Sequence, residues 1–280
     1  MLQTIPSIQD FKQKIRSFKY NHLTIGFVPT MGALHEGHLS LVRQAKREHN
    51  KVVVSIFVNP LQFGVNEDFQ KYPRTFERDC ELLSKEGVDI VFCPDREEMY
   101  PPGFCTAVII NNLEDKLCGK SRPGHFRGVA VAVLKLLNLA QPDNAYFGQK
   151  DFQQTVVIKR LVSDLHLDVR IKALPTVRTE EGLALSSRNT YLSELEKKDA
   201  LCLYKALVKA RSMVDSGIIN AKKIIQEMEN IICGYASATI DYISIVNAET
   251  LESVTSIEKG DVAVLAVRIG KTRLIDNMLL

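Results

Sequence analysis

The feature that most constrains the fold is a pair of short, largely apolar runs at residues 23–28 (LTIGFV) and 52–58 (VVVSIFV). Neither run alternates apolar with polar residues, so each is expected to be a strand buried on both faces, as in a parallel sheet covered by helices. A stretch with helical apolar spacing separates them, and a third apolar run at 88–92 follows another helical stretch at 75–86. This strand–helix–strand order predicts an α/β fold with a Rossmann-like, doubly wound parallel sheet.

The same alternation extends to Pro175 and then changes. Before Pro175 we expect a first helix at 7–19, strands at 106–110, 145–147 and 169–174, and helices at 129–140 and 151–165. Beyond it we expect helices at 193–214 and 220–232, and strands at 240–246 and 262–269. The sequence therefore predicts a Rossmann-like domain over residues 1–176 and a smaller α+β C-terminal domain over residues 177–280 that closes over it.

Composition narrows the class of function. The 280 residues are 45% hydrophobic and 25% charged, which is typical of a globular chain and excludes disordered, collagen-like and coiled-coil classes. A net charge of +3 is too small to predict binding to nucleic acid or to an anionic membrane. The chain has no Trp and only 7% aromatic residues, which argues against a base-stacking surface. Small-molecule substrates are the better expectation.

The cysteines and the first residues indicate the compartment. The six cysteines form no CxxC pair and no zinc-finger spacing with a histidine, so we expect reduced thiols and no metal held by protein ligands. The first residues are amphipathic and charged throughout, unlike a secretory signal or a membrane-spanning helix. These patterns predict a cytoplasmic protein with no membrane partner.

The turn after the first predicted strand, within residues 29–45, carries the strongest local signal. It combines a strand end, Gly32 and Gly37, His35 and His38, and the start of a helix. At this edge of an open α/β sheet, a glycine turn lets a phosphate approach the N–H groups of the next helix. The alternative is a tight turn with hydrated histidines, and an HxxH pair without a third ligand is a weak zinc signal.

Four further segments carry polar residues that suit substrate binding at the same edge. They contribute Asn59 and Gln62; Lys116, Lys120, Arg122 and Arg127; Gly148, Lys150, Asp151 and Gln154; and Ser186, Ser187 and Arg188. Neutral amides can hold hydroxyl and carboxylate groups, and the cations can bind phosphate. Taken singly, the segments are equally explained by an Asn-Pro turn, a solvated loop, a capped helix and a serine-rich turn.

Taken together, the segments PTMGALHEGH, FVNPLQFG, SRPGHFRGV, YFGQKDFQQ and ALSSRN resemble, in this order, the signature segments of the pantoate–β-alanine ligase (pantothenate synthetase) family. The resemblance is strong over residues 20–195 and includes the HIGH-type turn of the nucleotidylyltransferase superfamily. It implies an AMP-forming carbon–nitrogen ligase of pantothenate and coenzyme A biosynthesis. Such an enzyme condenses (R)-pantoate with β-alanine through pantoyl adenylate, consuming ATP and releasing AMP and pyrophosphate. It further implies Mg²⁺ with the ATP substrate and a homodimer.

The resemblance also implies residue roles. The ATP contacts would be Met31, Gly32, Ala33, Leu34, His35, Glu36, Gly37, His38, Gly148, Gln149, Lys150, Asp151, Val177, Leu185, Ser186, Ser187 and Arg188. Gln62, Gln154 and Asn59 would bind pantoate, and Gln62 would also contact β-alanine. The catalytic groups would be His38, His35, Lys150 and Arg188, with His38 as a proton donor and a source of positive charge. The loop from Arg122 to Arg127 would form a lid.

Two residues depart from the family pattern. Val65 stands where proline is usual, and Ala132 where threonine is common.

Two alternative functions stay open. Because the HxGH turn is shared by the whole superfamily, a nucleotidyltransferase acting on another small substrate is an alternative, although the paired amides and SRPGHFRG argue against it. An ATP-sensing or RNA-binding module without turnover is the other alternative.

Overall fold

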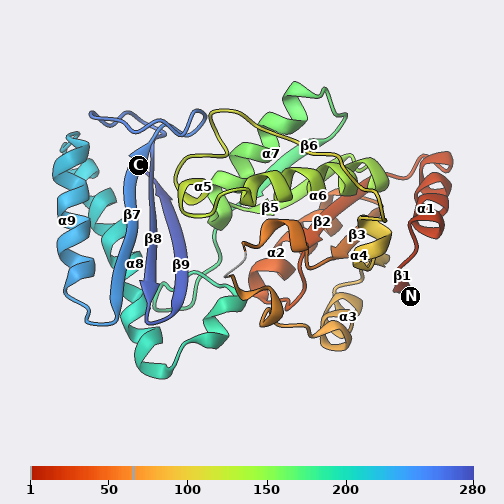
Figure 1. Cartoon of the computed structure of the whole chain (residues 1–280), viewed down its shortest axis with the longest axis horizontal. Coiled ribbons are helices and arrows are strands. Elements are labelled where there is room, and N and C mark those ends of the chain that lie inside the picture. The colour runs from red at the N-terminus through yellow and green to blue at the C-terminus, as the bar shows by residue number, and fades with distance from the viewer. Residues whose placement is uncertain (1, 65–66) are drawn as a thin grey trace.

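The computed structural model describes residues 2–64 and 67–280, so Val65 lies outside the described residues. Its first part is built on a six-stranded sheet with the order β1-β4-β3-β2-β5-β6, in which all paired strands are parallel (Figure 1). The strands are β1 (Gln3–Ile5), β2 (Ile25–Thr30), β3 (Lys51–Ile56), β4 (Ile90–Phe92), β5 (Asn144–Gly148) and β6 (Arg170–Leu174). The strand order reverses between β2 and β5, which is where ligands bind in folds of this type.

Helices cover both faces of this sheet, as the apolar strands predict. On one face α1 (Ile8–Tyr20) and α6 (His125–Ala140) pack, with Ile158 of α7 (Phe152–Asp164), against Phe27 of β2. On the other face α2 (Glu36–Glu48) and α3 (Phe76–Lys85) pack against Val28 of the same strand. Because neighbouring side chains of β2 enter opposite cores, the doubly wound α/β prediction is confirmed.

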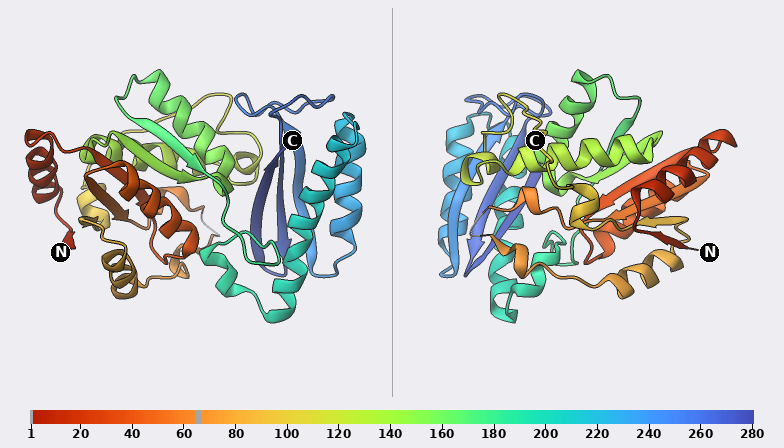
Figure 2. Two further views of the ribbon diagram at one scale, coloured as in Figure 1. Left: turned by 180° about the vertical axis from the view of Figure 1, so that it is seen from behind. Right: turned by 45° about the vertical axis from the view of Figure 1, so that its right-hand side comes forward.

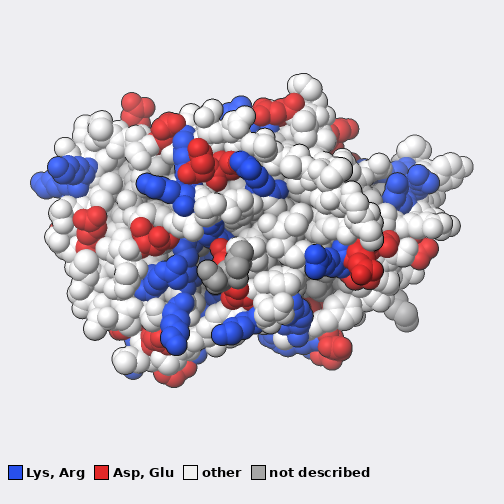
Figure 3. Space-filling model, in the orientation of Figure 1, with Lys and Arg blue, Asp and Glu red and all other residues white. Residues whose placement is uncertain are grey.

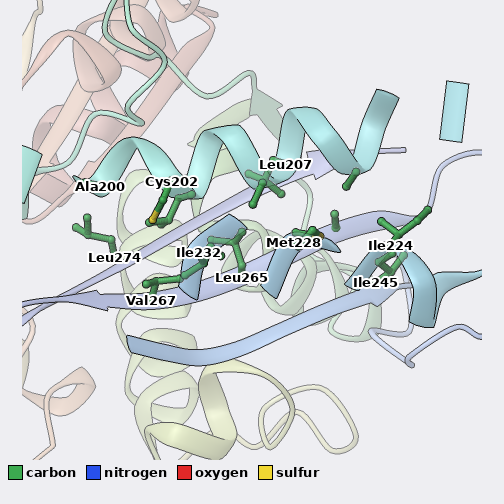
Figure 4. Close-up of a cluster of buried hydrophobic side chains, with 14 of the residues drawn as sticks. Ala200, Cys202, Leu207, Ile224, Met228, Ile232, Ile245, Leu265, Val267 and Leu274 are labelled. Carbon is green, nitrogen blue, oxygen red and sulfur yellow. The ribbon is translucent and has the colours of Figure 1, made fainter. Parts of the chain in front are cut away.

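A second, antiparallel sheet has the order β7-β8-β9, from β7 (Ala238–Val246), β8 (Val262–Ile269) and β9 (Thr272–Leu279). One face packs against α8 (Glu194–Asp215) and α9 (Ala221–Cys233), where Leu207 and Met228 meet Leu265 (Figure 4). The other face packs against residues 108–118, α6 and α7. Both faces of β8 are therefore covered, and the two sheets lie side by side along the molecule (Figures 1 and 2).

Short elements complete the chain and carry much of the site. They are the helices α4 (Arg96–Met99) and α5 (Cys118–Ser121), and the 3-10 turns Pro60–Gln62, Asp68–Gln70, Gln149–Asp151 and Ser187–Tyr191.

Within the described ranges, no helix combines the length and apolar character needed to cross a membrane. All six cysteines are free thiols.

One predicted strand is absent from the structure, and two observed strands were not predicted. Residues 106–110 are irregular and do not form a strand, because the backbone of Ile110 bonds locally: its N–H donates to Glu114 Oε2, and its carbonyl accepts from the N–H groups of Leu113 and Glu114. The short edge strand β1 was not predicted, and neither was β9. The sequence of β9 contains Asp276, whose carboxylate pairs with Arg178, and Asn277, whose side chain bonds to the carbonyls of Gln149 and Lys150 in the first part of the chain. The domain division at residue 176 stays a prediction; β6 ends at Leu174.

Candidate active site

The carboxyl ends of β2, β3 and β5 open into a cavity of about 220 Å³. One wall comes from α6, and residues 185–188 of the turn after the first sheet close another side. Lysine and arginine side chains gather near the middle of the face shown in Figure 3, next to acidic ones. A cavity at the point where the strand order reverses is the expected place for a ligand.

All five sequence segments meet at this cavity. Its lining includes the predicted site residues Met31, His35, Gly37, His38, Asn59, Gln62, Gly148, Lys150, Asp151, Gln154, Val177, Leu185, Ser186, Ser187 and Arg188. Five predicted ATP contacts are not part of the lining: Gly32, Ala33, Leu34, Glu36 and Gln149. Ala33 and Leu34 are buried, whereas Glu36 is exposed and pairs with Arg43.

The glycine turn does not offer all of its N–H groups to a ligand. Gly32 (φ 81°) and Ala33 (φ 49°) both lie in the left-handed region. The N–H groups of Ala33 and Leu34 donate to the buried carboxylate of Asp79, at 2.8 and 2.9 Å. These two donors are therefore occupied within the protein and are not free for phosphate.

The two histidines of the turn are neutral hydrogen-bonding groups. The Nδ1 atom of His35 accepts from the N–H of Gly37 at 3.1 Å, and Nδ1 of His38 accepts from the N–H of His35 at 3.4 Å. Burial, followed by the charge of Lys150, lowers the pKa of His35 to about 4. Burial, with His35 and Lys150 nearby, lowers the pKa of His38 to about 3. Both rings thus carry their proton on Nε2 at neutral pH and can donate it, but His38 supplies no positive charge in the ligand-free site.

Asn59 and Gln62, the two amides predicted to bind a ligand after β3, are hydrogen-bonded to each other. Asn59 is 2% exposed, and its Oδ1 accepts from the Tyr100 hydroxyl at 2.8 Å and from the N–H of Leu61 at 3.2 Å. Its Nδ2 donates to Gln62 Oε1 at 3.1 Å and to the carbonyl of Gly128 at 3.0 Å. Because these bonds use the whole amide, Asn59 orients Gln62 and has little capacity left for substrate.

The neighbouring glutamines at the start of α7 are used differently. Gln153 is buried, and its amide bonds to backbone groups of Leu113, Lys116 and Cys118. Gln154 lines the cavity, and its side chain makes no hydrogen bond to any residue in the described ranges. Gln154 is thus the member of the pair that can bind a ligand.

The basic loop contacts the backbone of Gln62, and it contains His125, a cavity residue that was not predicted from the sequence. His125 donates from Nδ1 to the carbonyl of Gln62 at 2.7 Å, while its Nε2 accepts from Arg122 at 3.0 Å. Burial, followed by the charge of Arg122, lowers the pKa of His125 to about 4. Arg122 also forms a bidentate pair with Glu67. The only sequence signal for His125 was its place within SRPGHFRGV.

Two further cations, Lys150 and Arg188, line the cavity, and each has its own contacts. The Lys150 Nζ lies 3.9 Å from the nearest Asp151 oxygen, whereas Arg188 makes a bidentate pair with Asp68 at 2.8 and 3.0 Å. The carbonyls of Gln149 and Lys150 accept from Asn277 Nδ2 at 2.9 and 3.0 Å. The second sheet therefore supports the Lys150 turn directly.

Apolar side chains form the remaining wall, and the sequence analysis did not assign them to the site. They are Phe57, Val129, Ala132, Val133 and Leu136. Ala132, one of the two departures from the family pattern, thus lies in the cavity wall. No cluster of three potential metal-ligating side chains occurs within residues 2–64 and 67–280.

Comparisons with known proteins agree with this geometry. The family model for pantoate–β-alanine ligase matches residues 3–279. Pantothenate synthetase of Caldicellulosiruptor saccharolyticus is 53% identical over 274 residues, which cover 98% of each chain. That of Thermotoga neapolitana is 52% identical over 280 residues, covering 100% of this chain and 99% of the other.

Two solved structures share the fold over the full length. Pantothenate synthetase of Thermus thermophilus superposes with a TM-score of 0.95 at 44% identity, covering 100% of this chain and 99% of the other. The pantoate–β-alanine ligase of Francisella tularensis, complexed with beta-gamma ATP and β-alanine, gives a TM-score of 0.83 at 36% identity, covering 100% and 98%. On this evidence the chain belongs to the pantoate–β-alanine ligase family.

Proposed function

We propose that the cavity condenses pantoate with β-alanine in two steps at the expense of ATP. In the first, a pantoate carboxylate oxygen attacks the α-phosphorus, the bond to the β-phosphate oxygen breaks, and pantoyl adenylate and pyrophosphate form. In the second, the neutral amine of β-alanine attacks the acyl carbon, AMP leaves, and the nitrogen loses a proton. The observation that carries this proposal is the convergence of cations, neutral imidazoles and neutral amides on one cavity.

The phosphate side of the reaction is assigned to Lys150, Arg188 and the histidines. Within the described residues, the nearest carboxylate oxygen to Lys150 Nζ is that of Asp151 at 3.9 Å, so Lys150 can act as a point charge on the phosphates. Arg188 would exchange the Asp68 carboxylate for phosphate oxygens, which accept the same bidentate pattern. His38 would donate its Nε2 proton as a hydrogen bond to a phosphate oxygen, and the charge of bound ATP would raise its pKa.

The acyl side is assigned to the amides and the apolar wall. Gln62 and Gln154 are neutral, so they can bind the hydroxyls and carboxylate of pantoate without competing as nucleophiles. Val129 and Val133 offer an apolar surface to the two methyl groups of pantoate. By the family resemblance, Gln62, which lines the same cavity, would also contact β-alanine.

Several further parts of the proposal concern the assembly. Mg²⁺ would enter with ATP, because it is commonly bound by substrate phosphates with one or two carboxylates, and Asp151 lines the cavity. The loop around Arg122 and the unit of residues 177–280 would exclude water from the adenylate. A cytoplasmic location fits the six free thiols. The homodimer rests on the family resemblance, and light scattering of the purified chain tests it.

The decisive experiment is ATP–pyrophosphate exchange with purified protein, with and without pantoate. We expect exchange that requires pantoate, and AMP release that requires β-alanine in addition. Exchange without pantoate would favour a nucleotidyltransferase for another substrate. ATP binding with no exchange under any condition would favour a sensing module, and either result would overturn the ligase proposal.

A further inference from the structure

A buried carboxylate occupies the concave side of the turn that carries the two histidines. Asp79 lies on α3 and is 0% exposed. Its Oδ2 accepts from the N–H of Ala33 at 2.8 Å, and its Oδ1 accepts from the N–H of Leu34 at 2.9 Å. The hydroxyl of Thr75 donates to Oδ1 at 3.1 Å. Asp79, a residue of α3, thus supplies the acceptors for the N–H groups of both Ala33 and Leu34.

The backbone of the turn is shaped for an anion at this point. Gly32 and Ala33 have successive positive φ values of 81° and 49°, and a non-glycine residue is uncommon in this region. Consecutive N–H groups in such turns converge on a common point and form an anion-binding concavity. In many phosphate-binding loops a substrate anion fills the concavity, whereas here the Asp79 carboxylate does. A Cβ at Gly32 would lie only 3.1 Å from Asp79 Oδ2, so the turn fits closely around the carboxylate.

The backbone bound by the Asp79 carboxylate leads directly into the two histidines at the start of α2. His35 caps α2 immediately after Leu34, and His38 lies in the first turn of that helix. The carbonyl of Ala33 accepts from Ser187 Oγ at 3.2 Å, which joins the same turn to the segment carrying Arg188. Asp79 itself does not line the active-site cavity; it lines a separate hollow on the other side of Met31 and Gly32.

We infer that Asp79 is a positioning residue for adenylate formation, acting through the backbone of Ala33 and Leu34 to set the place of His35 and His38. This inference rests on the proposed ligase function, because that function gives the histidines their role. The carboxylate has two equivalent acceptor oxygens, one for each N–H group. An amide has only one, so an asparagine would turn an NH₂ group toward one of the two N–H donors.

The test compares Asp79→Asn with Glu81→Gln, a change at an exposed position on the same helix. We expect Asp79→Asn to lower kcat of pantoate-dependent pyrophosphate exchange by about 10- to 100-fold, since a misplacement of about 1 Å costs about 100-fold. The KM for ATP should change by less than about threefold, and the reaction of supplied pantoyl adenylate with β-alanine should be much less affected. Glu81→Gln should match the wild type in all three measurements.

Two outcomes would overturn the inference. One is a folded Asp79→Asn enzyme whose exchange kcat stays within about twofold of the wild type. The other is an equal loss in both half-reactions that follows the loss of folded protein, since this would make Asp79 only a stability residue. If Asp79→Asn does not fold, Thr75→Val removes a single bond to the carboxylate, and an exchange kcat lower by a few-fold is expected; an unchanged value would refute the role.

A spectroscopic measurement separates this inference from the proposed function. The amide proton signals of Ala33 and Leu34 should lie downfield in the wild type, because a carboxylate accepts from both, and should move upfield in Asp79→Asn. If the wild type shows no pantoate-dependent exchange, the ligase proposal fails and the positioning role in adenylation fails with it. The amide signals would still show whether Asp79 shapes the turn. If the amide signals of Ala33 and Leu34 do not move in Asp79→Asn and pyrophosphate exchange stays normal, the inference is refuted while the ligase proposal stands.

Discussion

Lowering the pH from about 7 to about 5.5 should destabilise the ligand-free protein, because it contains histidines that are neutral when folded. The pKa of His38 is lowered to about 3 and that of His125 to about 4, chiefly by burial, from an ordinary value of 6.5. Between these folded values and 6.5 the unfolded chain binds more protons than the folded chain. The stability that these neutral histidines contribute is therefore fully present above about pH 6.5, and it is lost as the pH falls toward the folded pKa values.

The size of the effect follows from proton linkage. One histidine with a pKa of 6.5 when unfolded and 4 or less when folded loses about 1.2 kcal/mol of stability between about pH 7 and pH 5.5. Partial solvent exposure reduces this figure, so we expect about 2 kcal/mol from His38 and His125 together. Burial also lowers the pKa values of His35 and His49, which adds a loss of the same sign.

Two assays check the reasoning. Urea unfolding followed by circular dichroism should show the loss directly, and His125→Gln should lose about 1 kcal/mol less than the wild type over the same pH interval. The imidazole signals of His38 and His125, assigned with single variants in histidine-labelled protein, should remain those of neutral rings down to about pH 5. If either ring titrates near pH 6 in the folded protein, the lowered pKa and the calculated loss of stability are both wrong for that histidine.

Three substitutions test how the site is held. Asn59→Ala frees Gln62, so we expect KM for pantoate to rise about tenfold in steady-state kinetics; an unchanged KM would mean that Gln62 needs no such support. Lys150→Met should lower the rate of pyrophosphate exchange about 100-fold or more with little change in thermal stability, and a near-normal rate would remove Lys150 from the mechanism. Asn277→Ala removes both bonds to the Lys150 turn, so urea unfolding should show a loss of about 1–2 kcal/mol and kinetics a several-fold higher KM for ATP. Equal KM values in the wild type and Asn277→Ala would contradict the support from the second sheet.

The sequence predicted the sheet well because its strands are apolar on both sides. Phe27 and Val28 enter opposite cores, and no amphipathic alternative fits such a run. The strand β9 escaped prediction for the opposite reason. Its Asp276 and Asn277 interrupt the apolar pattern, because their side chains bond to Arg178 and to the Lys150 turn. A pattern based on burial cannot detect a strand whose polar residues satisfy distant partners.

The candidate site shows the same limit. The segments that meet at the cavity were recognisable, since each lies at a strand end or helix start with unusual polar residues. The groups that hold them were not, because Asp79 and Asn277 lie far away in sequence and carry no local signal. Asn59 was predicted to bind substrate, yet its amide is used within the protein, which only the hydrogen-bond geometry reveals.

The hydrogen bonds and ion pairs around the site are also relevant to how the unit formed by residues 177–280 can move. Asn277 bonds to the Lys150 turn, and Arg178 forms a bidentate pair with Asp276, which is 3% exposed. A rigid movement of this unit would leave the Arg178–Asp276 pair intact, since both residues belong to it, but it would have to carry the Lys150 turn with it or break the bonds of Asn277. By contrast, Arg188 is tied to the first part of the chain mainly through its pair with Asp68, and ATP phosphates can replace that carboxylate at little net cost because they accept the same bonds. Rearrangement on ATP binding should therefore begin at the Arg188 side chain, while the Lys150 turn keeps its contact with β9.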